Sequence, residues 1–190
     1  MILLLVNQIH SYAQEKAVDL VNFNLSVIGV GIQYEKALTE KITALGTIDY
    51  SGGFGYNYNG YDEGFDYMLT TRLSLEGRYY YNFESRASKG KNTANNSGNY
   101  LSLKLTVLPD WLTSSSNNWK INPQGSLSFN YGLKRSFAKN FFYELYAGPG
   151  VSMYSESNYK YNFALDRFEK KKETKIGAML DYGFRIGYNF

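Results

Sequence analysis

The chain has 190 residues, a formal net charge of +3 and no cysteine. This length allows one domain. The small charge gives no argument for nucleic acid as a partner, and the missing cysteine excludes disulfides, a thiol nucleophile and thiolate metal ligands. Nineteen tyrosines and 18 glycines, with only three prolines, favour strands and turns over helices.

The N-terminus has features of an export signal. Residues 2–6 form a short apolar run, and residues 11–13 (Ser-Tyr-Ala) resemble a small-x-small cleavage site that would leave Gln14 near the mature start. No positive charge precedes the run, which is shorter than usual. We therefore predict a truncated signal peptide over residues 1–13 and a mature domain over residues 14–190. The alternative is an ordinary buried strand at the start of the chain.

The next segment, Val18 to Lys36, could form one long strand or two short strands hinged near residues 26–29. Six later segments each show the pattern of a single strand. Bacterial outer-membrane barrels have an even number of strands and keep both chain ends in the periplasm. Two strands in this segment would give eight in total, whereas one strand would give seven. We therefore predict two.

The six later segments alternate between apolar and polar side chains, which is the period of a β-strand with two unlike faces. They are residues 42–50, 67–81, 101–107, 126–134, 143–153 and 174–190. In the last segment, Ile176 and Leu180 fall on one face, and Asp181 and Arg185 on the other. A charged face is a poor core for a soluble sandwich, but it suits a strand whose apolar side meets lipid. The prediction is an all-β, eight-stranded antiparallel transmembrane β-barrel.

The connectors between these segments fall into a short set and a long set, as is usual for the periplasmic and outer sides of such barrels. The short ones are residues 37–41 and 136–140, and the long ones are residues 52–66, 109–118 and 155–173. Residues 85–99 fit less well, because they are long for a periplasmic turn. Aromatic residues near the strand ends predict two interfacial girdles; Phe83 and Phe142 belong to the inner one.

The last long connector has a pattern of its own. Tyr159, Tyr161 and Phe163 alternate before residues 166–167, and Phe168 follows. This pattern predicts a hairpin that projects beyond the membrane with an exposed edge. Such an edge could add a strand from another protein, so these four aromatic residues are candidates for binding a partner.

The polar faces of the strands carry five acids and five bases, which we expect to line the interior. They are Glu35, Asp49, Glu76, Glu144, Asp181, Arg72, Arg78, Lys104, Lys134 and Arg185. A register slip of one residue would move Arg72, Glu76 and Arg78 into lipid, at about 2–4 kcal/mol for each Arg near the midplane. An eight-stranded barrel is only wide enough for its interior side chains to fill. We therefore predict a filled, salt-bridged interior in which the charges neutralise one another, and not a water pore.

Residues with recognisable catalytic or ligand-binding patterns are scarce. The only histidine is His10, inside the predicted signal, so the mature domain lacks the commonest general base. We assign no catalytic residue, cofactor or metal site. Asp62, Glu63 and Asp66 could hold calcium, but their spacing matches no defined loop. The lysine run at residues 170–172 is expected to be solvated or to contact lipopolysaccharide phosphates.

Residues 18–190 resemble the small eight-stranded outer-membrane β-barrels of the OmpA/OmpX type and the outer membrane protein β-barrel domain families. The resemblance rests on the alternation, the turn at residues 135–141, a Lys-Gly-Lys-Asn-Thr stretch at residues 89–93 and the terminal Tyr188-x-Phe190. That ending resembles the insertion signal of such barrels, although Arg185 stands where a glycine is common. The resemblance implies a place in the cell outer membrane, contact with its lipid and lipopolysaccharide, and insertion by the barrel-assembly machinery.

The fold of these families hosts adhesins, structural proteins and enzymes, so it does not decide the activity. We predict a non-enzymatic cell-envelope barrel whose outer loops serve surface interaction or envelope integrity, with an extracellular protein or surface ligand as candidate partner. The alternatives are a narrow, porin-like channel or transporter for small solutes and a histidine-free, lipid-modifying envelope enzyme. A soluble ligand-binding barrel would need the two faces of the strands exchanged.

Overall fold

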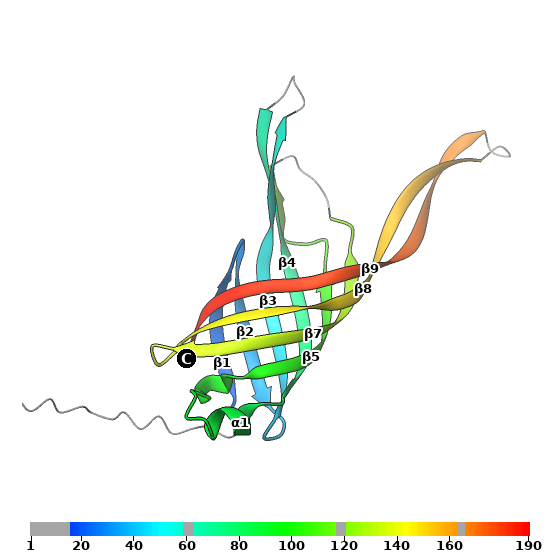
Figure 1. Ribbon diagram of the computed structural model, residues 1–190. Coiled ribbons are helices and arrows are strands. Elements are labelled where there is room, and N and C mark those ends of the chain that lie inside the picture. The colour runs from blue at the N-terminus through cyan, green and yellow to red at the C-terminus, as the bar shows by residue number, and fades with distance from the viewer. Residues whose placement is uncertain (1–15, 59–62, 117–120, 163–165) are drawn as a thin grey trace, which may run out of the picture.

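The computed structural model describes residues 16–58, 63–116, 121–162 and 166–190, and most of these residues lie in one antiparallel sheet (Figure 1). Its strands are β1 (Leu20–Ser26), β2 (Gly29–Ala37), β3 (Ile42–Tyr58), β4 (Glu63–Tyr80), β5 (Asn99–Leu108), β6 (Thr113–Ser115), β7 (Gln124–Phe137), β8 (Phe141–Asn162) and β9 (Arg167–Asn189). Two short helices, α1 (Phe83–Ala87) and the 3₁₀ turn η1 (Ala94–Asn96), join β4 to β5. Among the described residues, no helix is long and apolar enough to cross a membrane.

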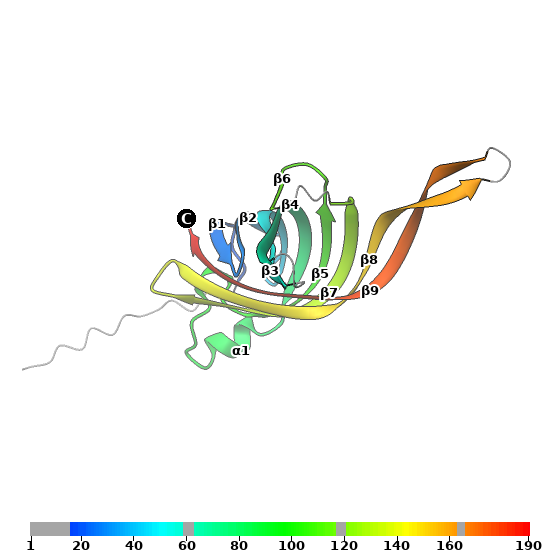
Figure 2. The same ribbon diagram turned by 90° about the horizontal axis from the view of Figure 1, so that it is seen from above.

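Eight of these strands close into a ring, an arrangement compatible with a barrel. Neighbouring strands pair in the order β1-β2-β3-β4-β5-β7-β8-β9, and β9 pairs back with β1. Short β6 lies outside the ring order and pairs with β4. The predicted division of Val18 to Lys36 into two strands is confirmed, because β1 and β2 form a hairpin around residues 27–28. Figure 2 shows the strands curving around a common interior.

Side chains in the ring alternate between a buried polar face and an exposed apolar face. Asn22 and Asn24 of β1 are fully buried. Val21, Phe23 and Leu25, which flank them along the strand, are exposed. Because successive strand residues point to opposite faces, the alternation in the sequence places the polar set inside the ring. This distribution is the reverse of the one expected for a soluble β-protein.

The two ends of the ring differ, and we name them the terminal end and the hairpin end. The terminal end carries the start of β1, the end of β9 and the turns at residues 38–41 and 138–140. At the hairpin end, β3–β4 and β8–β9 continue as paired strands well past their neighbours (Figure 1). Residues 52–66 and 155–173 are therefore largely strand. Cross-strand pairing continues to Asn162–Arg167, which confirms the hairpin predicted in the last long connector. Residues 52–66 were predicted only as a long connector, but pairing there continues to Tyr58–Glu63.

The seam that closes the ring is short on its hairpin side. β1 pairs with β9 over five residue pairs, from Asn22–Asn189 to Ser26–Arg185, and β1 then turns back into β2. Within the described chain, β9 residues 167–184 have no partner strand on the edge that faces β1. β8 pairs with the opposite edge of β9 throughout this stretch. The short β1–β2 hairpin therefore leaves a gap beside the free edge of β9, which we call the notch.

The connector between β4 and β5 folds across the terminal end, a role that its sequence did not predict. Phe83 is buried and stacks on Tyr80 with ring centroids 4.6 Å apart, and Tyr100 packs against Tyr80 at 5.4 Å. Arg86 donates hydrogen bonds to the carbonyls of Ser97 and Asn92 at 3.1 and 2.8 Å. Burial is the main cause that lowers the pKa of Arg86 from its usual value. Residues 83–98 thus form a packed cap, which accounts for a connector that is long for a turn.

Asn96 fastens this cap to the start of β1. Its side chain is fully buried, accepts a hydrogen bond from the Val18 N–H at 2.9 Å and donates one to the Val18 carbonyl at 2.9 Å. Asn96→Ala is expected to lower the free energy of unfolding by about 1–2 kcal/mol, because both backbone groups lose their partner. Urea titration measures this loss. Lys89→Ala, exposed in the same connector, should have little effect, and equal losses in the two variants would contradict the assignment.

An exposed ion pair beside β1 makes a pH-dependent contribution to stability. Asp19 accepts hydrogen bonds from Lys36 Nζ at 2.5 Å and from the Ala37 N–H at 2.8 Å, and these bonds lower the pKa of Asp19. Because the pKa is lower in the folded state, the stabilisation is present above about pH 4 and is lost as the pH falls through the folded value. The stability difference between the wild type and Asp19→Asn should therefore shrink from pH 7 to pH 3. A difference that stays constant in urea titrations across this range would refute the prediction.

Candidate functional site

All ten predicted interior charges lie on the inward faces of the ring, where they divide into two clusters. The cluster nearer the terminal end, the lower cluster, contains Glu35, Glu76, Arg78, Lys134 and Glu144. The cluster nearer the hairpin end, the upper cluster, contains Asp49, Arg72, Lys104, Asp181 and Arg185. The lower cluster has three acids and two bases, and the upper cluster has two acids and three bases. The interior is balanced as a whole, but its upper part carries an excess positive charge.

Arg78 is the centre of the lower cluster. Its Nη2 lies 2.6 Å from Glu144 Oε1 and 3.0 Å from Glu76 Oε2, and its guanidinium lies 4.3 Å from the centre of the Tyr100 ring. Tyr100 also donates a hydrogen bond to Glu144. Arg78 is 1% exposed and Glu144 is fully buried. One guanidinium therefore compensates two buried carboxylates: it is the ion-pair partner of Glu76 and the nearer of two cations beside Glu144.

Glu35 is the other anchor of the lower cluster. One carboxylate oxygen accepts hydrogen bonds from the hydroxyls of Tyr80 and Thr43, both at 2.8 Å. The other oxygen lies 3.1 Å from Lys134 Nζ, and the same ammonium lies 4.8 Å from the centre of the Phe142 ring. Together with Tyr100 and the cap, these bulky groups leave little open space at the terminal end.

In the upper cluster, Lys104 and Asp181 form a well-satisfied pair. Lys104 Nζ lies 2.9 Å from Asp181 Oδ2 and 4.3 Å from the centre of the Tyr146 ring. Ser128 Oγ and Asn130 Nδ2 donate to the same carboxylate oxygen at 2.8 and 2.9 Å. Arg185 links the two clusters at longer range, since its guanidinium lies 3.7 Å from Asp49 Oδ2 and 3.8 Å from Glu144 Oε2.

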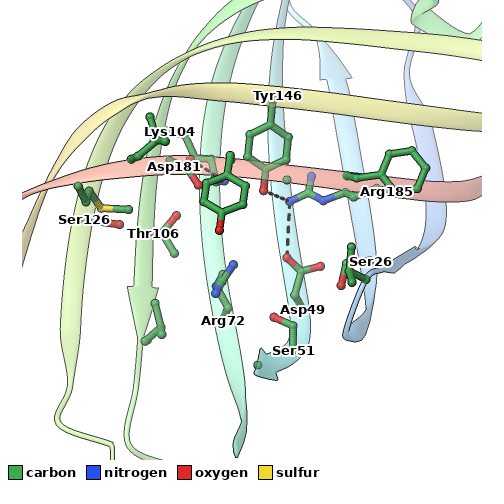
Figure 3. Close-up of a pocket in the computed structure, with 18 of the residues that line it drawn as sticks. Ser26, Asp49, Ser51, Arg72, Lys104, Thr106, Ser126, Tyr146, Asp181 and Arg185 are labelled. Atoms are coloured by element: carbon green, nitrogen blue, oxygen red, sulfur yellow. Dashed lines mark hydrogen bonds and ion pairs between the residues drawn. The ribbon is translucent and has the colours of Figure 1, made fainter. Parts of the chain in front are cut away.

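Arg72 differs from the other nine charges. Among the described residues it forms no hydrogen bond or ion pair, and its Nε is buried without a partner. Asp49 stands opposite Arg72 in the β3–β4 register, but its carboxylate pairs with Arg185 instead. Figure 3 shows the Arg72 guanidinium pointing into open space between Asp49 and Thr106.

The open space is a cavity of about 760 Å³ that occupies the upper interior. Its inner wall includes Arg72, Lys104, Asp181 and Arg185, and it also reaches β9 side chains that face outward, such as Tyr182. A second cavity of about 670 Å³ lies toward the hairpin end and also borders Arg72. We expected side chains to fill the interior. Buried side chains do so around the lower cluster, whereas the upper part is hollow and has small side chains such as Ser26, Ser51 and Ser126 in its lining.

Two predicted girdle residues have a different position. Phe83 is 1% exposed and belongs to the cap, and Phe142 is fully buried inside the ring against Lys134. Phe142 follows Phe141 directly in β8, so the pleat of the strand turns the two rings to opposite faces. The placement of these two in the girdle was therefore wrong. Tyr34, Tyr79 and Tyr188 remain on the exposed face.

The remaining candidate residues are only partly described. Tyr161 and Phe168 pack edge to face at 5.1 Å in the projecting β8–β9 hairpin, and both are exposed. Phe163 lies outside the described residues, as does the side chain of Tyr159. Tyr188 and Phe190, the predicted insertion signal, lie on the exposed face at the terminal end, where their rings are 5.4 Å apart.

Residues 1–15, with His10 and the predicted signal, lie outside the described chain, and so do Asp62 and the side chains of Glu63, Lys170 and Lys171. Asp66 accepts a hydrogen bond from Ser116 Oγ at 2.9 Å. In the described part of the chain, no group of three or more His, Cys, Asp or Glu side chains is placed to hold a metal ion.

Sequence reasoning found the ten charges but missed three features of the site: the aromatic lining from Tyr80, Tyr100 and Phe142, the cap, and the cavity. The sequence did contain a signal for the two tyrosines, because they fall at the alternate positions of β4 and β5 that carry the polar, inward-facing residues. It contained no signal for the cavity, because the cavity depends on the length of β1 and β2. No protein-family model, curated protein or solved structure matches this chain.

Proposed function

We propose that the chain is an eight-stranded β-barrel of the cell outer membrane, inserted by the barrel-assembly machinery and not an enzyme. The observation that carries the proposal is the inverted distribution of side chains around a closed ring. Ile48, Leu103 and Phe129 are 62%, 56% and 52% exposed, while Arg78, Lys134 and Glu144 behind the same sheet are at most 1% exposed. In water, exposing an apolar band and burying charges would both be unfavourable, whereas contact with lipid favours this arrangement. Closure of the ring also pairs most of the backbone N–H and C=O groups at the strand edges, which could not form hydrogen bonds with lipid.

The terminal end of the ring supports a barrier rather than a channel. Arg78, Tyr80, Tyr100, Lys134 and Phe142 are all buried within the interior at this end. Below them, residues 83–98 fold across the opening. A solute would need to break several buried ion pairs to pass, so we expect the barrel not to conduct. In the proposed orientation, the terminal end faces the periplasm and the long hairpins face outward.

The projecting hairpins supply the surface for interaction. β3–β4 and β8–β9 extend beyond the ring and present aromatic side chains, with Phe54 stacked on Phe65 at 5.6 Å and Tyr161 against Phe168 at 5.1 Å. The exposed Lys172 side chain lies in the β8–β9 hairpin. We propose that these hairpins contact an extracellular protein, a surface ligand or lipopolysaccharide.

Membrane fractionation combined with gel electrophoresis of unheated and boiled samples tests the architecture. We expect the protein in the outer-membrane fraction, with an unheated band that migrates differently from the boiled one. Recovery in a soluble fraction would refute the proposal.

Planar-bilayer recording tests the barrier, and steady conductance steps from the purified protein would favour the channel alternative. Deletion of residues 159–168 should abolish surface binding without changing the heat-dependent mobility.

A further inference from the structure

The upper cavity combines properties of a binding site for a small anionic group. It is lined by three bases and two acids, so its charge is positive when all five are ionised. Lys104 and Arg185 each have a carboxylate partner, which leaves the excess charge on Arg72. A guanidinium has five N–H donors, and those of Arg72 have no acceptor in the described part of the chain. An oxyanion in the cavity would supply such acceptors.

The position of Arg72 makes it accessible to a ligand. It borders both the upper cavity and the second cavity toward the hairpin end, so it stands where the two meet. Thr106, Ser126 and Ser51 line the same space and offer hydroxyl donors. The lining of the upper cavity stops at Asp49, Tyr146 and Arg185, and the lower cluster and the cap lie beyond. The cavity is therefore closed toward the terminal end, so a ligand would bind there without passing through the ring.

The cavity also has an apolar exit at the notch. Consecutive β9 residues from Met179 to Arg185 line it, although successive strand residues face opposite sides of the sheet. Leu180 and Tyr182 are 64% and 73% exposed on the outer face, and Val27 across the notch is 79% exposed. The cavity thus wraps around the free edge of β9 and joins the charged interior to the apolar exterior.

We propose that this cavity binds an anionic head group, phosphate or carboxylate, on Arg72, and that the group belongs to an amphiphile whose chain leaves through the notch. The head group would take the unpaired donors of Arg72, and the chain would lie on Leu180 and Tyr182. The anion site depends only on the cavity. The amphiphilic source rests on the proposed function, because it requires the outer face to meet lipid.

Titration of the folded protein in nonionic maltoside micelles tests the proposal, with inorganic phosphate and dodecyl phosphate as probes. Native mass spectrometry measures the occupancy by dodecyl phosphate. Competition with inorganic phosphate measures the affinity of the protein for the free anion. We expect one dodecyl phosphate per protein, bound more tightly than phosphate. Dodecyltrimethylammonium, which has the same chain and a cationic head, should not bind.

Matched variants separate the head group from the chain. Arg72→Gln should weaken dodecyl phosphate binding by about tenfold or more, because a charge-assisted hydrogen bond is lost. Arg167→Gln, which removes an exposed guanidinium from the projecting hairpin, should not change it. Leu180→Ala should weaken dodecyl phosphate about threefold and leave phosphate unchanged, because less apolar area is covered. Heat-dependent mobility shows that each variant is folded, and Arg72→Lys provides a charge-preserving second variant.

Each result supports or overturns a defined part of the proposal. Equal affinities for phosphate and dodecyl phosphate would overturn the amphiphilic source and leave a site for a free anion. If the Arg72→Gln variant binds dodecyl phosphate with the same affinity as the wild type, the proposed site is overturned, because the probe would then be held by the micelle or by the protein surface. Absence of binding by both probes would also overturn the site. If phosphate binding depends on Arg72 in a protein that fails to fractionate with the outer membrane, the anion site stands and the proposed function falls.

Discussion

Arg78→Met is expected to lower the free energy of unfolding by about 3–5 kcal/mol, because it leaves buried Glu76 without its cation and removes the nearer cation from buried Glu144. The guanidinium lies within 3.0 Å of both Glu76 and Glu144, and Glu144 is fully buried. Methionine keeps an unbranched side chain, so the effect reports mainly the charge. Urea titration of the protein folded into phospholipid vesicles, followed by circular dichroism, measures the loss.

Two further variants identify the cause of that loss. Arg167→Met removes an exposed guanidinium whose partner is the neighbouring Glu169, and it should change stability by less than about 1 kcal/mol. The double variant Arg78→Met/Glu144→Gln should recover part of the loss, because the amide carries no charge that needs a partner. If the double variant were less stable than Arg78→Met, the loss would have to come from packing and not from uncompensated charge.

Ile48→Arg is expected to destabilise the vesicle-inserted protein by about 2–4 kcal/mol, which is the cost of an arginine at the centre of a lipid-facing strand. Ile48 lies in the middle of the ring part of β3, where it pairs with Ile32 and Leu73, and its side chain is 62% exposed. On a water-facing sheet, the same change at an exposed position would have little effect. Urea titration in vesicles therefore distinguishes a membrane-spanning ring from a soluble one.

Phe54→Arg is the matched control on the same strand. Phe54 is also 62% exposed, but it lies in the part of β3 that projects beyond the ring. We expect its replacement to cost less than about 1 kcal/mol, since an arginine near or beyond the interface remains hydrated. If Ile48→Arg and Phe54→Arg lowered the free energy of unfolding by the same amount, whether large or small, the result would argue against a lipid band around the ring.

The faces of the strands could be read from the chain because they are a local property. Successive residues of a strand point to opposite sides, so the alternation around Asp181 and Arg185 separates inside from outside without knowledge of the partner strands. The same reasoning placed all ten charges in the interior. The choice of two strands between Val18 and Lys36 came instead from the expected parity of the ring.

Partnerships within the interior could not be read in this way, because they depend on how the ring closes. Arg78 and Glu144 are 66 residues apart in sequence and meet only because β4 and β8 curve around the same interior. Arg72 and Asp49 face each other in the register, yet Asp49 pairs with Arg185 across the ring. Which charges meet depends on their distances in space, and these distances are set by strand tilt and stagger, not by sequence spacing.

Alternation along this chain thus determined the strands, their unlike faces and the enclosed set of charges. The tertiary structure alone decided which charges compensate one another, how residues 83–98 cap one end, and where the ring remains open beside β9. The physical reason is the range of the interactions. A pleated strand sets the direction of each side chain within two residues, whereas a cavity, a cap and the unpaired guanidinium of Arg72 arise from the lengths and positions of strands that are distant in sequence.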